Sequence, residues 1–318
     1  MTYPSSQKTV LIGKETSWGT AVSATKDIGL VQDASDNISR EIKESMALGS
    51  VEAQKITTGI VDVGFSTTAE FQHGRLFEYL CGTVTHTNSS TDFRHTFAVA
   101  AAAPSATIES GENGSTDNAL IMDGMLAEAG ELSIALNEVL KLKVDWKGRS
   151  VLPTSTTSAA VIDTLPTFPH AQVDINIDGT AATEVQNFSM KINKKVERSG
   201  GISSNVYQQG HPTELRCEFS GQLGFDDKTY TDLFVSGTTS STLASTTDPR
   251  SYEVEIDADN GTAYGSGQRA CKLTFSNCHM KTLDKAASVG NLIFVDIAGS
   301  GKFSTAITVD DINGTTTW

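Results

Sequence analysis

Apolar and polar residues alternate along several stretches of this chain, and the alternation predicts β-strands. From Val61 to Phe71 the odd positions are Val, Val, Phe, Thr, Ala and Phe, whereas the even positions are Asp, Gly, Ser, Thr and Glu. The stretch from Leu215 to Leu223 alternates in the same way with Glu, Arg, Ser and Gln. Because successive side chains of a strand point to opposite faces of a sheet, each stretch predicts an antiparallel strand with one polar face.

The same order of elements is predicted twice along the chain. A first strand, an alternating strand, a short amphipathic helix and a closing glycine occur at 37–42, 61–71, 76–80 and Gly82, and again at 187–192, 215–223, 230–234 and Gly237. Matching positions differ by 187 − 37 = 150, 219 − 71 = 148 and 237 − 82 = 155. A repeat of about half the chain predicts two fused copies of one unit.

Each unit is expected to have about six strands, the others lying at 9–13, 132–136, 140–146, 271–275 and 292–295. Since 318 residues exceed the usual size of one hydrophobic core, two domains are expected. We predict an all-β dominated fold, sandwich-like or barrel-like, with one short helix in each of two tandem similar domains. The first domain spans 1–150, a Ser/Thr/Ala/Pro-rich surface linker 151–168, and the second domain 169–318. The tail from Asp310 to Trp318 is expected to be flexible or held by a neighbour.

Both units contain a long connection between their paired strands, at about 45–58 and 196–212. These segments are rich in Gly, Ser and Gln and have no periodic pattern. Loops of this length in a compact domain are either disordered or used for binding. Their occurrence at the same place in both units favours binding.

The formal net charge of −14 argues against a surface that grips nucleic acid, because such surfaces are basic. The same charge suits a surface past which nucleic acid moves without sticking, although acidity also serves solubility alone. The basic cluster Lys191, Lys194, Lys195 and Arg198 borders a long loop, where ion pairs are favoured over DNA binding. No basic, apolar leader and no run of about 18 apolar residues occurs, so we expect folding in the cytoplasm.

The sequence supports no catalytic or metal-binding pattern. The spacing of Cys271, Cys278 and His279 matches no common zinc pattern, and the four cysteines are expected to be buried free thiols. Glu70 with His73, and Glu214 with Glu218, could perform acid–base chemistry, but polar strand faces predict solvated side chains. No Gly-x-Ser-x-Gly elbow or phosphate-binding loop occurs. We expect no enzyme, no cofactor and no metal.

One phrase near the start of the chain resembles a known family. The segment Ile12-Gly13-Lys14-Glu15-Thr16-Ser17-Trp18-Gly19-Thr20-Ala21 is similar to the opening of the major tail tube proteins of long-tailed phages and archaeal tailed viruses. In those proteins a Gly-Lys/Gln-Glu-x-x-(Tyr/Trp)-Gly-Thr phrase follows the first strand. The order of strand, long loop, alternating strand and short helix also resembles the tail tube domain shared with type VI secretion tubes.

The resemblance implies a ring of six such domains whose sheets join edge to edge into an inner barrel. With two domains in each chain, three chains would form a pseudo-sixfold ring, and rings would stack into a tube for viral DNA. The polar strand faces would then line the lumen, although they could instead face outer solvent. The lumen candidates are Asp62, Ser66, Thr68, Glu70, Glu214, Glu218, Ser220 and Gln222. Arg216 departs from this acidic and hydroxyl-rich set and is expected to pair with a neighbouring carboxylate.

The two long connections are the expected contacts between rings or subunits, disordered in the free chain and ordered on assembly. The contact candidates are Ala47, Leu48, Val51, Lys55, Ile202, Val206 and Tyr207. Expected partners are further copies of the chain, the tape measure, tail tip and tail terminator proteins, and double-stranded DNA that passes without specific binding. The expected place is the virion tail, assembled in the host cytoplasm. The alternatives are a capsid decoration or receptor-binding β-protein and a β-sandwich hydrolase.

Overall fold

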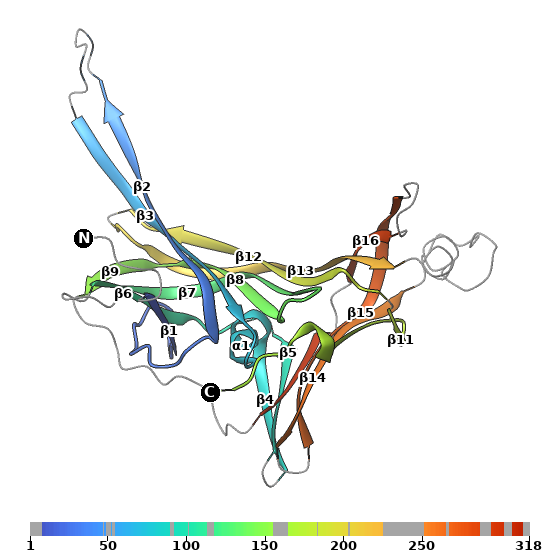
Figure 1. Ribbon diagram of the computed structural model, residues 1–318. Helices are drawn as coiled ribbons and strands as arrows, with labels where there is room; N and C mark the ends of the chain where they lie inside the picture. Colours follow the sequence, from blue (N-terminus) through green and yellow to red (C-terminus); the bar gives the residue numbers. More distant parts are fainter. Residues whose placement is uncertain are drawn as a thin grey trace.

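The computed structural model describes residues 8–46, 48, 52, 55–89, 92–100, 102–112, 118–154, 165–182, 184–202, 204–224, 251–264, 267–286, 294–301 and 307–313. These residues form mostly β-strands and one α-helix (Figure 1). The predicted β-dominated fold class is therefore confirmed. The second helix, predicted at 230–234, lies outside the described residues.

The elements of the first half are β1 (Lys8–Lys14), β2 (Leu30–Ser45), β3 (Lys55–Glu70), α1 (Arg75–Cys81), β4 (Gly82–Ser89), β5 (Asp92–Val99), β6 (Ala106–Glu112), β7 (Asn118–Ala135), β8 (Lys141–Gly148) and β9 (Ser150–Thr154). Those of the second half are the 3-10 helix η2 (His170–Gln172), β10 (Val173–Ile177), β11 (Thr180–Ala181), β12 (Asn187–Gly200), β13 (Tyr207–Gly224), β14 (Tyr252–Tyr264), β15 (Gly267–Ala286), β16 (Phe294–Gly301) and β17 (Ile307–Asn313).

One antiparallel sheet runs through both halves of the chain. Its strands follow the order β2-β3-β8-β7-β12-β13-β16-β15, and we call these eight strands the main sheet. The pairing of β7 with β12 joins the two halves. The order β2-β3-β8-β7 in the first half matches the order β12-β13-β16-β15 in the second.

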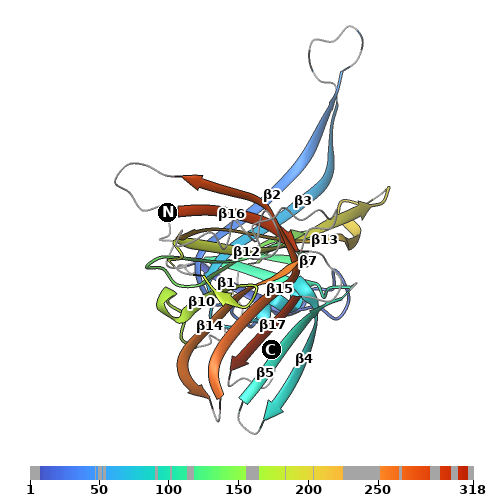
Figure 2. The same ribbon diagram turned by 90° about the vertical axis from the view of Figure 1, so that its right-hand side faces the viewer.

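Smaller groups of strands pair with the parts of the long strands β7 and β15 that reach beyond the main sheet. The first part of β7 pairs with β6 and β9, and β6 pairs with β1. The first part of β15 pairs with β14 and β17, and β14 pairs with β10. The last strand, β17, also pairs with β5 of the first half, so the two halves of the chain meet a second time at this pairing (Figure 2).

The hydrophobic core lies on one face of the main sheet. Buried side chains of β3, β8, β12 and β13 alternate with polar ones, as the period of two predicts. Helix α1 packs against this core, and all seven of its residues are buried. The helix ends at Gly82, whose φ of 110° lies in the left-handed region that favours glycine.

The expected long loops are mostly strand. Strands β2 and β3 reach Ser45 and begin again at Lys55, while β12 and β13 leave only residues 201–206 between them. Cross-strand hydrogen bonds hold these segments even though their side chains lack a simple alternation, because most of the side chains near the tips are exposed or half-buried. The prediction of two long aperiodic loops was therefore wrong in extent.

Two other boundary predictions also differ from the structure. Residues 151–154 of the expected linker belong to β9, which pairs with β7, and Phe168 at the other end of the linker is fully buried. Residues 310–313 of the tail belong to β17, which is paired on both sides within the chain. Both segments are short and polar, so their pairing depends on distant strands that the local pattern does not reveal.

Candidate assembly surfaces

The polar face of the main sheet contains all eight lumen candidates. On β3 they alternate with the buried Val63, Phe65, Thr67 and Ala69. On β13 they alternate with buried residues in the same way. The registers from β3 through β8, β7 and β12 to β13 connect the buried positions into one face, so the candidates share the opposite face.

Lysines are interleaved with carboxylates on this polar face. In register, Lys143 lies opposite Glu131, Glu131 opposite Lys191, and Lys191 opposite Glu218. Lys147 forms an ion pair with Glu128. The face is therefore mixed in charge rather than purely acidic, and neighbouring opposite charges reduce its attraction for phosphates.

Sequence reasoning missed the lysines of β8, namely Lys141, Lys143 and Lys147. Their signal was present, because each alternates with a core residue in the stretch 140–147. Arg216 forms the expected ion pair, with Glu214 at 2.6 Å.

Two long hairpins begin in the main sheet. We call β2–β3 the first hairpin and β12–β13 the second hairpin. Ile38 pairs with Val63 in the first, and Ile192 pairs with Cys217 in the second. On both strands, equivalent residues of the two hairpins are therefore 154 positions apart in the sequence, since 192 − 38 = 154 and 217 − 63 = 154.

One irregularity of the first hairpin coincides with one of the second as well. A register shift falls immediately before Ile42 in the first hairpin and immediately before Val196 in the second, and 196 − 42 = 154. This structural offset replaces the values of 150 and 148 obtained from the residue types. With it, the residue of the first half that is equivalent to Phe219 is Phe65 and not Phe71. A shared bulge at the same place makes the two hairpins equivalent residue by residue.

The second hairpin lies against the first half of its own chain. Arg198, near its tip, pairs with Asp62 of β3 and donates to the main-chain oxygens of Val63 (3.1 Å) and Gly148 (2.8 Å). Its guanidinium also lies 4.3 Å from the centre of the Tyr207 ring. The side chain of Arg198 is only 8% exposed, so these contacts fix the position of the hairpin.

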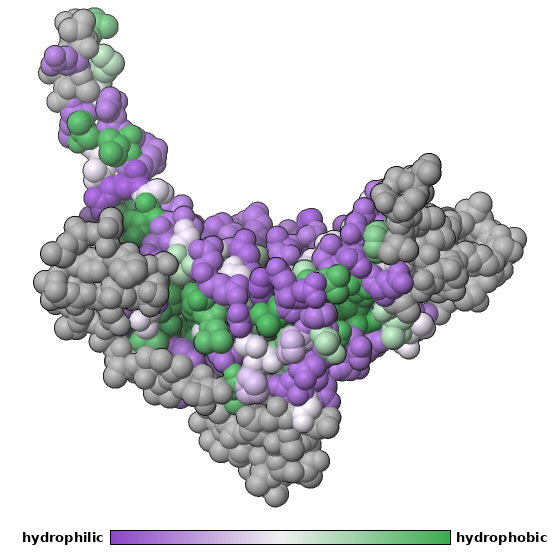
Figure 3. Space-filling view, viewed as in Figure 1, coloured by the Kyte–Doolittle hydropathy of each residue, from purple (hydrophilic) through white to green (hydrophobic). Residues whose placement is uncertain are grey.

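The first hairpin projects from the molecule as an arm (Figure 1). Hydrophobic side chains lie among hydrophilic ones along it (Figure 3). Its exposed apolar residues are Ile38, Ile42, Met46, Leu48 and Ile56, with exposures from 42% to 109%. Several exposed apolar side chains on one projecting element are typical of an interaction surface.

The contact candidates lie at the tips of the two hairpins. Leu48 and Ile202 are fully exposed, Lys55 begins β3, and Val206 and Tyr207 are half-buried at the start of β13. Ala47 and Val51 lie outside the described residues.

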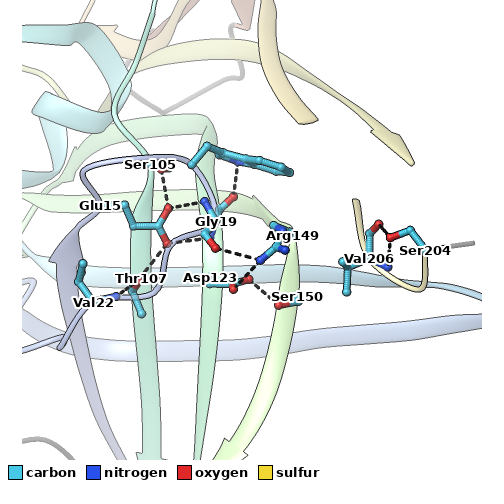
Figure 4. A network of polar contacts seen from close by, with 12 residues as sticks. Glu15, Gly19, Val22, Ser105, Thr107, Asp123, Arg149, Ser150, Ser204 and Val206 are labelled. Carbon is cyan, nitrogen blue, oxygen red and sulfur yellow. Dashed lines mark hydrogen bonds and ion pairs between the residues drawn. The ribbon is translucent and has the colours of Figure 1, made fainter. Parts of the chain in front are cut away.

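The Gly-Lys-Glu-x-x-Trp-Gly-Thr phrase forms a loop that is anchored by its glutamate (Figure 4). The buried carboxylate of Glu15 accepts hydrogen bonds from the hydroxyls of Ser105 (2.6 Å) and Thr107 (2.9 Å). It also accepts from the backbone N–H groups of Gly19 (2.9 Å) and Gly124 (2.8 Å). Four donors from three segments stabilise a buried charge that would otherwise be costly.

Trp18 of the same loop reaches the second hairpin. Its indole N–H donates to the oxygen of Gly124 (3.0 Å). A Cβ at Gly210 of β13 would lie 3.1 Å from the indole ring and 2.9 Å from Leu126, so a larger residue there would displace these two side chains. The phrase therefore holds the second hairpin against the first half.

The other candidate residues are structural. Lys194 points into the core, and Lys195 pairs with Glu197, so ion pairs and burial account for most of the basic cluster. His73 is buried beside Asp27 (3.3 Å), which corrects the expectation of a solvated position, because the chain turns inward before α1. All four cysteines are buried thiols, and none of them forms a disulfide.

Within the described part of the chain, no group of three or more His, Cys, Asp or Glu is arranged to hold a metal ion. None of the helices described there is long and apolar enough to span a membrane.

The family model of the phage tail tube protein matches residues 5–291. The chain belongs to the phage tail tube protein family. No match was found among curated proteins. The family match confirms the predicted resemblance and covers the anchored loop and both hairpins.

Membership in the tail tube family settles three expectations. The protein is a structural component of the virion tail, and it is not an enzyme. Tail tube proteins self-assemble, so the exposed arm belongs to a protein that binds its own copies.

Proposed function

We propose that three copies of this chain form a ring with pseudo-sixfold symmetry, and that stacked rings form the tube through which viral DNA passes. The observation that carries the proposal is the pair of end strands of the main sheet. Among the described residues, β2 pairs only with β3, and the final part of β15 pairs only with β16. A sheet with two open edges pairs with further copies.

The junction between the halves supports the way in which copies would join. Strand β7 pairs with β12 from Ala129–Asn193 to Ala135–Asn187. By position in the sheet order, β15 corresponds to β7 and β2 corresponds to β12. The edge of β15 in one copy can therefore pair with β2 of the next by repeating the internal step, as in two fused domains at 1–150 and 169–318.

Repetition of one step leads to a closed ring when the rotation divides a full turn. Six steps of about 60° would use three chains with two units each. The match of β2-β3-β8-β7 to β12-β13-β16-β15 supports equal steps within and between chains. Head-to-tail contacts between rings do not close, so they produce a filament.

The polar face of the main sheet would line the lumen. Its hydroxyls and amides are uncharged, and its cations Lys147 and Arg216 are paired with carboxylates, so the duplex could slide without specific binding. The tube ends would contact the tape measure, tail tip and tail terminator proteins. The tail tube family favours this function over a decoration protein or a hydrolase.

Electron microscopy of the purified full chain tests the proposal. We expect tubes with a central channel, and class averages of single rings with three repeated chains and pseudo-sixfold features. Rings with another number of chains would contradict the stoichiometry. Persistent monomers under all assembly conditions would contradict the function.

A further inference from the structure

We propose that Glu44 of one copy forms an ion pair with Arg216 of the next copy, at the site where Arg198 pairs with Asp62 inside the chain. The inference rests on the proposed ring and names residues at the contact between its chains. It follows from the equivalence of the two hairpins and from the difference in what covers them.

The equivalence assigns each residue of the internal contact a partner in the other half. With the offset of 154, Arg198 corresponds to Glu44, since 198 − 154 = 44, and Asp62 corresponds to Arg216, since 62 + 154 = 216. The paired partners agree, because Arg198 lies opposite Gly210, Glu44 opposite residue 56, and 210 − 56 = 154. The ion pair is conserved in position but reversed in sign.

The reversal is informative because it requires two changes at once. The second hairpin of a chain lies on the first half of the same chain. If the step between units is the same between chains, the first hairpin of the next copy lies on the second half of the preceding copy. There a glutamate at 44 meets an arginine at 216, whereas any single change would have placed like charges together.

Both groups are accessible in the single chain. The side chain of Arg216 is 66% exposed and pairs with Glu214, which is 47% exposed. Exposed pairs of this kind contribute little, so Arg216 can exchange partners at small cost. Glu44 is exposed on the projecting arm.

The apolar residues of the arm require the same neighbour. Ile192 and Val196 of the second hairpin are 1% and 5% exposed, whereas their counterparts Ile38 and Ile42 are 42% and 60% exposed. The first hairpin therefore has apolar side chains at positions that are buried in the second hairpin, but here these side chains are exposed. A second copy of this chain covers them, because the second half repeats the strand order that covers Ile192.

The test is a charge-reversal cycle in the full chain. The variants are Glu44→Arg, Arg216→Glu and the double variant, with Glu41→Arg as the matched control. Glu41 lies on the same strand, and its counterpart Lys195 is a basic residue that remains 60% exposed. The critical concentration for tube formation is measured by pelleting and electron microscopy, and urea unfolding of the unassembled chain checks folding.

We expect each single reversal to raise the critical concentration about tenfold or more, since like charges then face each other in the contact. The double variant should return to within about threefold of the wild type, and the control should stay within about twofold. If a reversed variant fails to fold, Glu44→Gln and Arg216→Gln should each raise the critical concentration about threefold.

Two results would overturn the inference while leaving the ring intact. Wild-type tubes could form while both single variants behave like Glu41→Arg, or the double variant could assemble no better than the worse single variant. A wild-type chain that forms no tubes under any condition would overturn the proposed function together with this contact.

Discussion

The second hairpin packs against the first half of its own chain, whereas the equivalent first hairpin projects from the molecule with its apolar side chains exposed. Both have the same register, the same bulge and apolar residues at the same positions. Ile192 is 1% exposed, whereas Ile38 is 42% exposed. The difference teaches that burial here depends on which unit is adjacent, and not on the hairpin's own sequence.

The comparison also separates two kinds of sequence requirement. The second hairpin can rely on permanent contacts, such as Arg198 with two main-chain oxygens, because its partner is in the same chain. The first hairpin must stay soluble until another copy arrives, so Lys43 and Glu44 accompany its apolar residues.

The largest expected effect concerns the equivalent isoleucines. Ile192→Ala should lower the free energy of unfolding by about 2–5 kcal/mol, because it leaves a cavity in the core. Ile38→Ala should lower it by less than about 1 kcal/mol in the unassembled chain. Urea unfolding below the assembly concentration measures both values. Equal losses would show that the arm is folded back in solution.

The next effect concerns Lys194 and its exposed counterpart Arg40. Burial lowers the pKa of Lys194 from 10.5 to about 8, with the neighbouring Cys81 opposing the shift. The unfolded chain therefore binds more protons between pH 8 and 10.5, so this group makes stability rise with pH by up to about 3 kcal/mol.

Lys194→Met should remove this contribution. The difference in unfolding free energy between variant and wild type should favour the variant at pH 7.5 and shrink towards pH 10. Subtracting the wild-type unfolding free energy from that of the variant removes the contribution of the buried thiols, which both proteins share. The raised pKa values of these thiols make stability fall with pH, in the opposite direction to Lys194. Arg40→Met is the control, and its difference should not change with pH.

A smaller effect is expected at the Trp18 contact. Gly210→Ile would give the second hairpin the residue that the first hairpin has at Ile56. The added side chain overlaps Trp18 and Leu126, so we expect a loss of about 1–3 kcal/mol and a change in tryptophan fluorescence. Ile56→Ala, on the exposed arm, should leave both readouts of the unassembled chain unchanged.

The smallest effect is expected from the exposed pair on the arm. Glu41 and Lys43 lie 3.5 Å apart and are 66% and 69% exposed. Exchanging the two residues reproduces the order Lys195–Glu197 of the second hairpin. The urea midpoint of the unassembled chain should not move measurably. A clear shift would mean that the arm contacts its own chain.

Local pattern was sufficient for the strands that have one buried face. The alternation around Phe65 and Phe219, the stop at Gly82 and the buried cysteines were all predictable, because burial leaves a period of two or an apolar position. The family could be recognised from the phrase around Glu15 and Trp18.

Features that depend on distant partners could not be predicted. The hairpin tips carry polar residues on both faces, so their strands left no periodic signal in the sequence. Arg198 looked like part of a basic loop because Asp62 is 136 residues away. The lysines of β8 became part of the candidate surface only when the register placed them beside Glu128 and Glu131.

Strand β17 pairs with β15 of the second half and with β5 of the first half, so one seven-residue segment holds strands of both halves together. Removal of β17 would therefore uncover two strand edges at once, one in each half. Such edges are templates for unwanted pairing, so we expect a chain without β17 to aggregate rather than assemble.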